Sequence, residues 1–202
     1  MEAGIDEAGR GPVLGPLVVA GVATADPQRL ADLGCKDSKK LSPAKRVRLA
    51  RLLEDDSQVQ IAVRIIEPAD LDAEMATATL NEVVLRRFQS IAEDLDAPRT
   101  VVDAADVDAA RFGRRVAEAL PEGAVVVAEH KADDRHATVA AASIIANEPS
   151  IRTSGPAMFF KRATNIIDMM TTQYHPFHAS DMAARTKARD RRPERRKAAP
   201  RP

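Results

Sequence analysis

Apolar residues recur along the chain with two spacings, one typical of strands and one typical of helices. In the segment 58–66, Val59, Ile61 and Val63 alternate with polar residues, which predicts a strand with one buried face. Other short apolar runs predict further strands, and the second should lie antiparallel to the first because a Gly-Pro loop joins them. The predicted strands cover residues 2–6, 17–24, 58–66, 100–102 and 124–128.

Helical spacing marks the segments between these strands. Ser42 is a good N-cap, and Pro43 suits the first helical position, so a helix is expected to begin there. A second helix is expected from Leu80, a third after the N-cap Asp108, and one of small residues over 138–146. A strand meander followed by alternating strands and helices predicts an α/β fold with a five-stranded mixed β-sheet flanked by α-helices.

Composition limits the classes of function. Lys plus Arg and Asp plus Glu both number 30, so the formal net charge is zero and any attraction to a polyanion must be local. Aromatic residues make up 3% of the chain, which argues against a base-stacking platform. No stretch approaches the ~20 apolar residues that cross a bilayer. We therefore expect a cytoplasmic protein with no membrane partner.

Cysteine and histidine offer little chemistry. Cys35 is the single cysteine, which excludes an intrachain disulfide and favours a reducing compartment. No neighbouring general base would activate its thiol, so we interpret it as inert. His130 and His136 are six residues apart and lack the usual zinc-binding pattern. For both histidines, a solvated or hydrogen-bonded side chain is the favoured interpretation.

Acidic residues follow several predicted strands. Asp6 and Glu7 end the first strand, Asp103 ends the fourth, and the pair Asp133-Asp134 follows the fifth. Taken alone, such a pair is more often a solvated turn. Carboxyl ends of parallel strands meet at one edge of a sheet, however. Carboxylates ~4 Å apart would repel by roughly 4 kcal/mol per pair at an effective dielectric of 20, and a hard cation, Mg²⁺ or Mn²⁺, would relieve that repulsion.

Two segments could contact phosphate. In Gly9-Arg10-Gly11 the absent side chains allow close backbone approach, and Arg10 can make a bidentate contact. A tight structural turn is an equally good interpretation of this loop. The basic segment 36–40 precedes a capped helix, and a solvated loop is its ordinary interpretation.

Six motifs taken together resemble the ribonuclease HII family, the type 2 ribonucleases H, in its archaeal form. They are, in order across residues 4–146, GIDEAGRGPVLGP, DSKKLS, TLNE, VVDAADVD, EHKADD and AASIIA. The resemblance implies a ribonuclease H-like fold and an endonuclease that cuts the RNA strand of RNA/DNA hybrids. Cleavage would fall 5′ to a ribonucleotide and leave 3′-hydroxyl and 5′-phosphate ends. Such an activity suits removal of RNA primers and of misincorporated ribonucleotides.

The resemblance also implies site residues, metals and partners. Two Mg²⁺ or Mn²⁺ ions would clamp the attacking water and the leaving oxygen. The substrate would be an RNA/DNA hybrid or a duplex DNA containing ribonucleotides, bound by a monomer. The catalytic and metal-binding carboxylates fall on Asp6, Glu7, Asp103 and, in preference to Asp134, Asp133. The loop that senses the 2′-hydroxyl falls on Gly9, Arg10 and Gly11, and the backbone-contacting positions on Lys39 and Asn81.

The family pattern stops after residue 146. We expect a catalytic domain over 1–146 and a divergent, basic, partly disordered segment over 147–202, where Pro149 would stop the preceding helix. A changed reading frame or a replaced terminus is one hypothesis for the shift in residue usage. A non-catalytic hybrid-binding protein or a defective remnant is therefore the alternative function. A small-molecule phosphatase using the same acids is a third interpretation.

Overall fold

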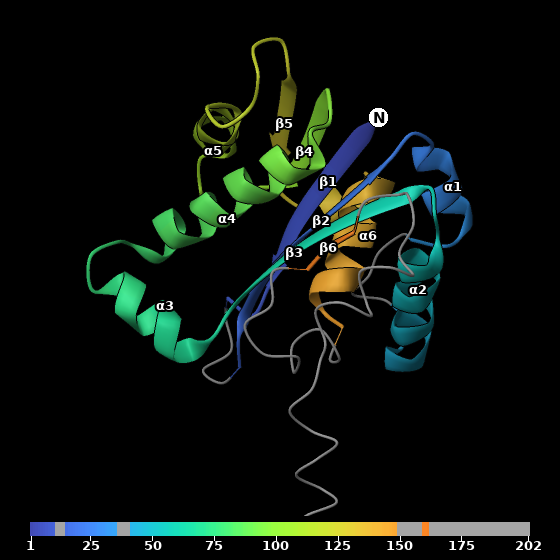
Figure 1. Cartoon of the computed structure of the whole chain (residues 1–202), viewed down its shortest axis with the longest axis horizontal. Helices are drawn as coiled ribbons and strands as arrows, with labels where there is room; N and C mark the ends of the chain where they lie inside the picture. Colours follow the sequence, from blue (N-terminus) through green and yellow to red (C-terminus); the bar gives the residue numbers. More distant parts are fainter. Residues whose placement is uncertain (11–14, 36–40, 149–158, 162–202) are drawn as a thin grey trace, which may run out of the picture. The chain divides into compact units, whose positions relative to one another are not determined.

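The fold is that of an α/β protein (Figure 1). The computed structural model describes residues 1–10, 15–35, 41–148 and 159–161, all within one compact unit that spans Met1–Asn165. Gly11 and Lys39, two of the predicted substrate contacts, lie outside the described residues, as does almost all of the predicted segment 147–202. Among the described helices, none is both long enough and apolar enough to span a bilayer.

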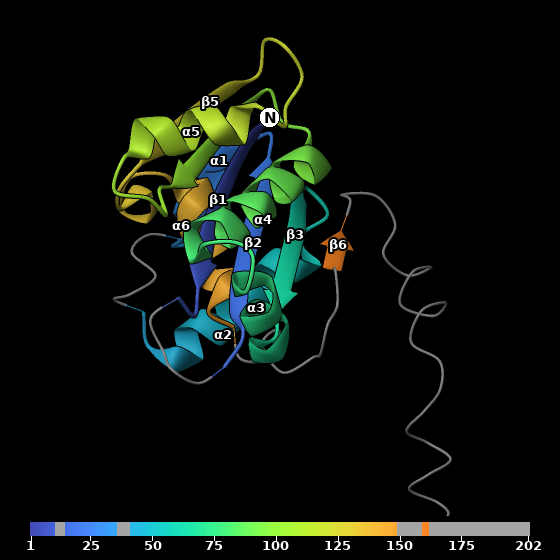
Figure 2. The same ribbon diagram turned by 90° about the vertical axis from the view of Figure 1, so that its left-hand side faces the viewer.

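One mixed sheet organises the described chain. Its strand order is β5-β4-β1-β2-β3-β6; the pairs β1–β2, β2–β3 and β3–β6 are antiparallel, and β1–β4 and β4–β5 are parallel. The five predicted strands are all present, and a short sixth one extends the sheet beside β3 (Figure 2). The strands are β1 (Glu2–Ala8), β2 (Leu17–Thr24), β3 (Val59–Ile66), β4 (Arg99–Asp103), β5 (Val125–Glu129) and β6 (Phe159–Lys161).

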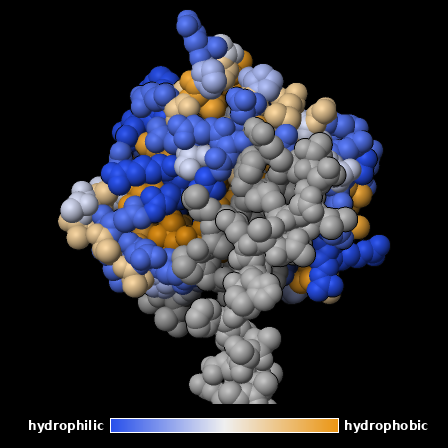
Figure 3. All heavy atoms as spheres, viewed as in Figure 1, coloured by the Kyte–Doolittle hydropathy of each residue, from blue (hydrophilic) through white to orange (hydrophobic). Residues whose placement is uncertain are grey.

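Helices cover both faces of the sheet (Figure 1). One face packs against α3, α4 and α5, where Phe88 and Phe112 meet edge to face with ring centroids 5.1 Å apart. The other face packs against α1, α2 and α6. Seen from the side of Figure 1, polar side chains cover much of the described surface, with apolar ones visible between them (Figure 3). The helices are α1 (Pro27–Asp32), α2 (Pro43–Asp55), α3 (Pro68–Met75), α4 (Leu80–Leu95), α5 (Ala109–Ala117) and α6 (Ala137–Ala146).

Helix starts follow the capping chemistry of the sequence. The Ser42 side chain accepts a hydrogen bond from the Lys45 backbone N–H at 3.4 Å, and Asp108 accepts one from Arg111 at 2.9 Å, as predicted. The short helices α1 and α3 were not predicted. Both begin with a proline, Pro27 and Pro68, at the first helical position, which is the signal that could have revealed them.

The prediction of a half-buried strand over 58–66 was wrong. Both faces of β3 are covered, because α4 packs on the face that carries the polar side chains. Arg64 on that face is 9% exposed. Its guanidinium donates to Ser90 Oγ at 2.9 Å and forms an ion pair with Asp94, both on α4. A strand that alternates polar and apolar residues can therefore be buried on both sides when the facing helix supplies polar partners.

Close contact between α6 and β1 brings the fold's central helix against the strand that ends in Asp6. A Cβ atom built on Gly4 would lie 2.2 Å from the Thr138 carbonyl carbon and 2.2 Å from the Val139 backbone nitrogen. Only glycine fits there, because the obstacle is backbone that cannot rotate away. Small residues of α6, which is buried from Thr138 onwards, permit the same close approach.

Gly4→Ala is therefore expected to destabilise the protein strongly. Overpacking of a core costs about 1–3 kcal/mol, and a clash with backbone should reach or exceed the upper end of that range. The measurement is the free energy of unfolding by urea. Gly34→Ala is the matched control: its Cβ would meet nothing within 4 Å, but its φ of +93° is strained for alanine, which costs about 1–2 kcal/mol. Equal losses in the two variants would contradict the packing argument.

Candidate active site

Two carboxylates lie side by side at the ends of β1 and β4. The parallel register pairs Ile5 with Val102, so Asp6 and Asp103, the next residue on each strand, are neighbours. Strand alternation turns Asp6 to the same face as Gly4, which α6 covers. Glu7 follows at the point where β1 approaches its end, and its side chain is 15% exposed. The sheet therefore brings together three of the four predicted metal ligands.

Asp6 is the most perturbed of these acids. Its side chain is 5% exposed, and its pKa is raised from 3.8 to about 8. Burial is the largest cause, and the charges of Glu7 and Asp103 add to it. A hydrogen bond with Ser143 of α6 and one from the Glu7 backbone N–H, at 2.8 Å, oppose the shift. Burial and the neighbouring acidic charges thus disfavour the ionised form of Asp6.

Asp133 approaches the site from the turn after β5. That turn is the short 3₁₀ helix η2 (Ala132–Asp134), which follows Lys131 at a φ of +56°. The Ala132 backbone N–H donates to Asp103 Oδ1 at 3.2 Å, which ties the turn to the end of β4. Asp133 is 2% exposed, whereas Asp134 is exposed. Burial next to the Asp103 anchor thus favours Asp133 over Asp134 as the functional acid.

The arrangement can concentrate negative charge at one point. Within the part of the chain that the structure describes, however, no three carboxylate, histidine or cysteine side chains are already arranged to hold a metal ion. Side-chain rotations would have to bring the oxygens closer. The donor chemistry fits a hard divalent cation, because every candidate ligand is a carboxylate. A cation there would also oppose the effect of burial and of the neighbouring charges on Asp6.

Arg10 follows Glu7, just after the end of β1. Its side chain is held by α4 and by the loop after β4. Its guanidinium donates to the Ala105 carbonyl oxygen and to Asn81 Oδ1, and it lies 3.8 Å from Glu7 Oε1. Asn81 stands in the first turn of α4, whose N-cap is Thr79. Two of the predicted substrate contacts, Arg10 and Asn81, are therefore in direct contact. Gly9, the residue before Arg10, has a φ of +92°.

Asp106 completes this network and was missed by the sequence reasoning. It accepts hydrogen bonds from the Asp108 backbone N–H at 3.1 Å and from Arg111 at 2.7 and 2.8 Å. The hydrogen bond from the Asp108 N–H is the largest cause of the lowered pKa of Asp106, and Arg111 lowers that pKa further. The Asn81 oxygen accepts from Arg10, and Asn81 also contributes to the lowered pKa of Asp106. Asn81 is thus near both Arg10 and Asp106.

Other missed contributors have weak sequence signals. Ser143 stands among apolar residues in α6, and a polar side chain in such a helix is a usable hint. The Ala132 N–H and the Ala105 carbonyl are main-chain groups, which no residue pattern reveals. Their roles follow from the turn after β5 and the loop after β4, respectively.

Histidine and cysteine behave as interpreted from the sequence. His136 Nε2 lies 3.3 Å from Glu129 Oε2, and His130 Nε2 lies 3.4 Å from the Val107 carbonyl oxygen. Cys35 is buried, and burial raises the pKa of its thiol to about 11. A thiol that holds its proton so firmly is a poor nucleophile at neutral pH.

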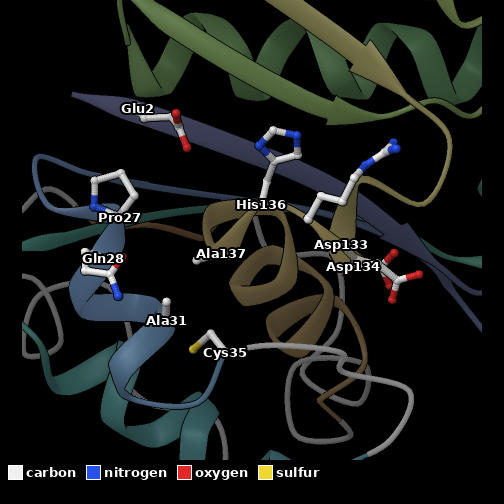
Figure 4. A pocket seen from close by; sticks show the side chains of 10 residues that line it. Glu2, Pro27, Gln28, Ala31, Cys35, Asp133, Asp134, His136 and Ala137 are labelled. Atoms are coloured by element: carbon white, nitrogen blue, oxygen red, sulfur yellow. The ribbon is translucent and has the colours of Figure 1, made fainter.

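A separate pocket of about 340 Å³ lies over the start of α6 (Figure 4). Residues of α1 and Cys35 border it on one side, and the segment 133–137 borders it on the other. Glu2, at the beginning of β1, also lines it. Neither Asp6, Glu7 nor Asp103 does. The pocket is therefore distinct from the carboxylate cluster, although Asp133 stands at its border.

Comparison with known proteins identifies the family. The sequence profile of the family described as Ribonuclease HII matches residues 3–150 of the 202. The chain is 47% identical over 146 residues to Ribonuclease HII of Archaeoglobus fulgidus, an alignment that covers 72% of this chain and 69% of the relative. It is 44% identical over 152 residues to Ribonuclease HII of Thermococcus onnurineus, covering 71% of this chain and 64% of that relative. The chain thus spans about two thirds of the length of these relatives.

Solved structures give the same result. The chain resembles a chain in the structure of the PCNA:RNase HII complex from Archaeoglobus fulgidus. The TM-score is 0.68 and the sequence identity 47%, and the match covers 73% of this chain and 70% of the other chain. It also resembles Bst-RNase HIII in complex with Mn²⁺, with a TM-score of 0.59 and 26% identity, covering 73% of this chain and 50% of that one. These likenesses confirm the predicted ribonuclease H-like fold. The chain belongs to the ribonuclease HII family of endoribonucleases.

Proposed function

We propose that the chain is a divalent-metal-dependent endonuclease that hydrolyses the RNA strand of RNA/DNA hybrids, cutting 5′ to a ribonucleotide to leave 3′-hydroxyl and 5′-phosphate ends. The observation that carries the proposal is the burial of Asp6 with Glu7 and Asp103 close enough to raise its pKa. Membership of the ribonuclease HII family supports the reaction class. The Mn²⁺ complex of Bst-RNase HIII supports the use of a divalent metal.

Asp6, Glu7, Asp103 and Asp133 are the residues that would hold Mg²⁺ or Mn²⁺, and two ions are expected. Bound divalent cations make water a stronger nucleophile at neutral pH and neutralise charge on the leaving oxygen. The chain's own contribution is positional. β1 and β4 hold Asp6 and Asp103 side by side. The hydrogen bond from the Ala132 N–H to Asp103 anchors the turn that contains Asp133.

Recognition of the ribonucleotide would fall to the loop after β1. Arg10 and nearby backbone N–H groups would contact the phosphate and check for the 2′-hydroxyl, the group that distinguishes RNA from DNA. Asn81 and the Ala105 carbonyl hold the Arg10 guanidinium in position for this contact. Gly11 in the same loop and Lys39 in the basic segment remain proposed substrate contacts. The enzyme is proposed to act as a monomer.

One observation favours a second candidate, a hybrid-binding protein without turnover. The alignments cover 69% and 64% of the two archaeal relatives, so about a third of each relative has no matched counterpart in this chain. Binding of a hybrid duplex with no cleavage, in the presence of Mg²⁺ or Mn²⁺, would favour this candidate.

Asp103→Asn is expected to reduce cleavage of a duplex that holds one ribonucleotide by at least about a hundredfold in saturating Mg²⁺, because the loss of one charge weakens metal binding and orientation. The same assay compares Asp133→Asn, which should be as damaging, with Asp134→Asn, which should retain activity. Ligation of the products tests whether they carry 3′-hydroxyl and 5′-phosphate ends. Undiminished cleavage by Asp103→Asn would exclude its assigned role. Loss of cleavage in Asp134→Asn but not in Asp133→Asn would assign the role of Asp133 to Asp134 instead.

Metal-free stability should depend on pH through Asp6. Between pH 3.8, its ordinary pKa, and about 8, its pKa in the folded protein, the unfolded chain has lost this proton while the folded chain keeps it. The folded state then binds more protons, so the free energy of unfolding in EDTA falls as pH rises through that window. The stabilising contribution is complete below pH 3.8 and lost above about 8.

Asp6→Asn should flatten this fall, because asparagine does not titrate. Asp134→Asn, at an exposed acid, should leave the fall unchanged. Urea unfolding at a series of pH values measures both variants against the original chain. A pH dependence that survives Asp6→Asn intact would contradict the assigned ionisation.

Asn81→Ala should lower kcat/KM for the single-ribonucleotide duplex by about tenfold or more, because hydrogen bonds to charged groups contribute about 1.5–3 kcal/mol. The effect should be small in an Arg10→Ala background, since Asn81 acts through Arg10. Gln89→Ala is the matched control on α4, where the amide bonds the Arg115 carbonyl instead. Additive losses in the double variant would mean that the two residues act independently.

A further inference from the structure

The exposed face of α2 carries a row of three basic residues. Lys45, Arg48 and Arg51 are all exposed, and none forms an ion pair with another described residue. In contrast, Arg29, Arg64, Arg87, Arg99, Arg111, Arg115 and Arg135 each pair with a carboxylate. The row therefore differs from most of the other basic side chains that the structure describes.

Charge placement on α2 runs against the stability of the helix. No acidic residue stands in its first turn and no basic residue in its last, the reverse of what the helix dipole favours. Lys45 lies in the first turn, while Glu54 and Asp55 end the helix. Like charges three residues apart, such as Lys45 and Arg48, also repel. Local stability gives no reason for this pattern, which points to a requirement outside the helix.

Packing connects this helix to the carboxylate site through α6. The buried side of α2, formed by Leu49, Ala50 and Leu53, shares a core cluster with Ala8 at the end of β1 and with the end of α6. Ser143, the hydrogen-bond partner of Asp6, belongs to the same part of α6. Figures 1 and 2 both show α2 next to that end of α6.

We propose that the row formed by Lys45, Arg48 and Arg51 binds the phosphodiester backbone of the duplex, away from the bond that is cut. The row spans about 9 Å along the helix, from a rise of ~1.5 Å per residue. That length matches the rise of about three phosphates on one strand, at ~3.4 Å each. The proposal rests on the proposed function only in taking a nucleic-acid duplex as the ligand.

The test uses the full chain with two matched double substitutions. Arg48→Gln/Arg51→Gln removes two charges from the row. Arg86→Gln/Arg114→Gln removes two exposed charges from α4 and α5, on the other face of the sheet. Binding of a 24-base-pair RNA/DNA hybrid is measured in EDTA, where cleavage does not interfere, over a series of KCl concentrations.

The α2 variant should bind the hybrid at least tenfold more weakly at low salt, and the slope of log K against log[KCl] should become shallower by about 1.8, roughly 0.9 for each lost phosphate contact. The control variant should match the original chain. Equal slopes in all three proteins would overturn the proposal. So would an equal weakening by the control, which would indicate a general effect of net charge.

Cleavage kinetics supply a readout that a merely structural role would not move. With the 24-base-pair substrate and Mg²⁺, the α2 variant should show a raised KM with unchanged kcat. With an 8-base-pair substrate centred on the ribonucleotide, the α2 variant and the original chain should have the same KM and kcat. A lowered kcat on both substrates would overturn the proposal. Absence of cleavage by every protein would count against the proposed function alone, because the salt slopes in EDTA still test α2.

Discussion

Burial of an acidic side chain among other acids, at the ends of two parallel strands, is the constraint on which the site depends. Asp6 is enclosed between the sheet and α6, and Glu7 and Asp103 stand close enough to disfavour its ionisation. A hydrogen bond from Ser143 offsets only part of that effect, since the pKa still rises to about 8. An acid held in this way is poorly suited to a purely structural role. It is well suited to receive a divalent cation, which would replace the proton.

The remainder of the fold maintains this arrangement. α6 can reach Asp6 only because Gly4 leaves room for the helix backbone against β1. The parallel register of β1 and β4 sets Asp103 beside Asp6, and the Ala132 N–H ties the turn after β5 to Asp103. The contacts of Arg10 with Asn81 and with the Ala105 carbonyl join the proposed recognition loop to α4 and to the loop after β4. The proposed metal-binding and recognition residues thus share the same two strand ends.

Sequence patterns predicted the strands and capped helices because each depends on local chemistry. Ser42 and Asp108 cap their helices as expected, and the acids at strand ends meet because parallel strands align their carboxyl ends. Contacts between distant segments were not predictable in the same way. The burial of Arg64 depends on Ser90 and Asp94 from a helix that no strand pattern specifies. The Asp106–Asn81 contact likewise joins two segments whose proximity only the fold determines.

The central claim is that Asp6 and Asp103 jointly bind a divalent cation. The most direct measurement is a crystal structure of the full chain grown with Mn²⁺, in which anomalous scattering locates the metal. The account predicts a Mn²⁺ ion coordinated by carboxylate oxygens of both Asp6 and Asp103. Fully occupied Mn²⁺ bound elsewhere, with the Asp6 carboxyl left uncoordinated, would contradict it.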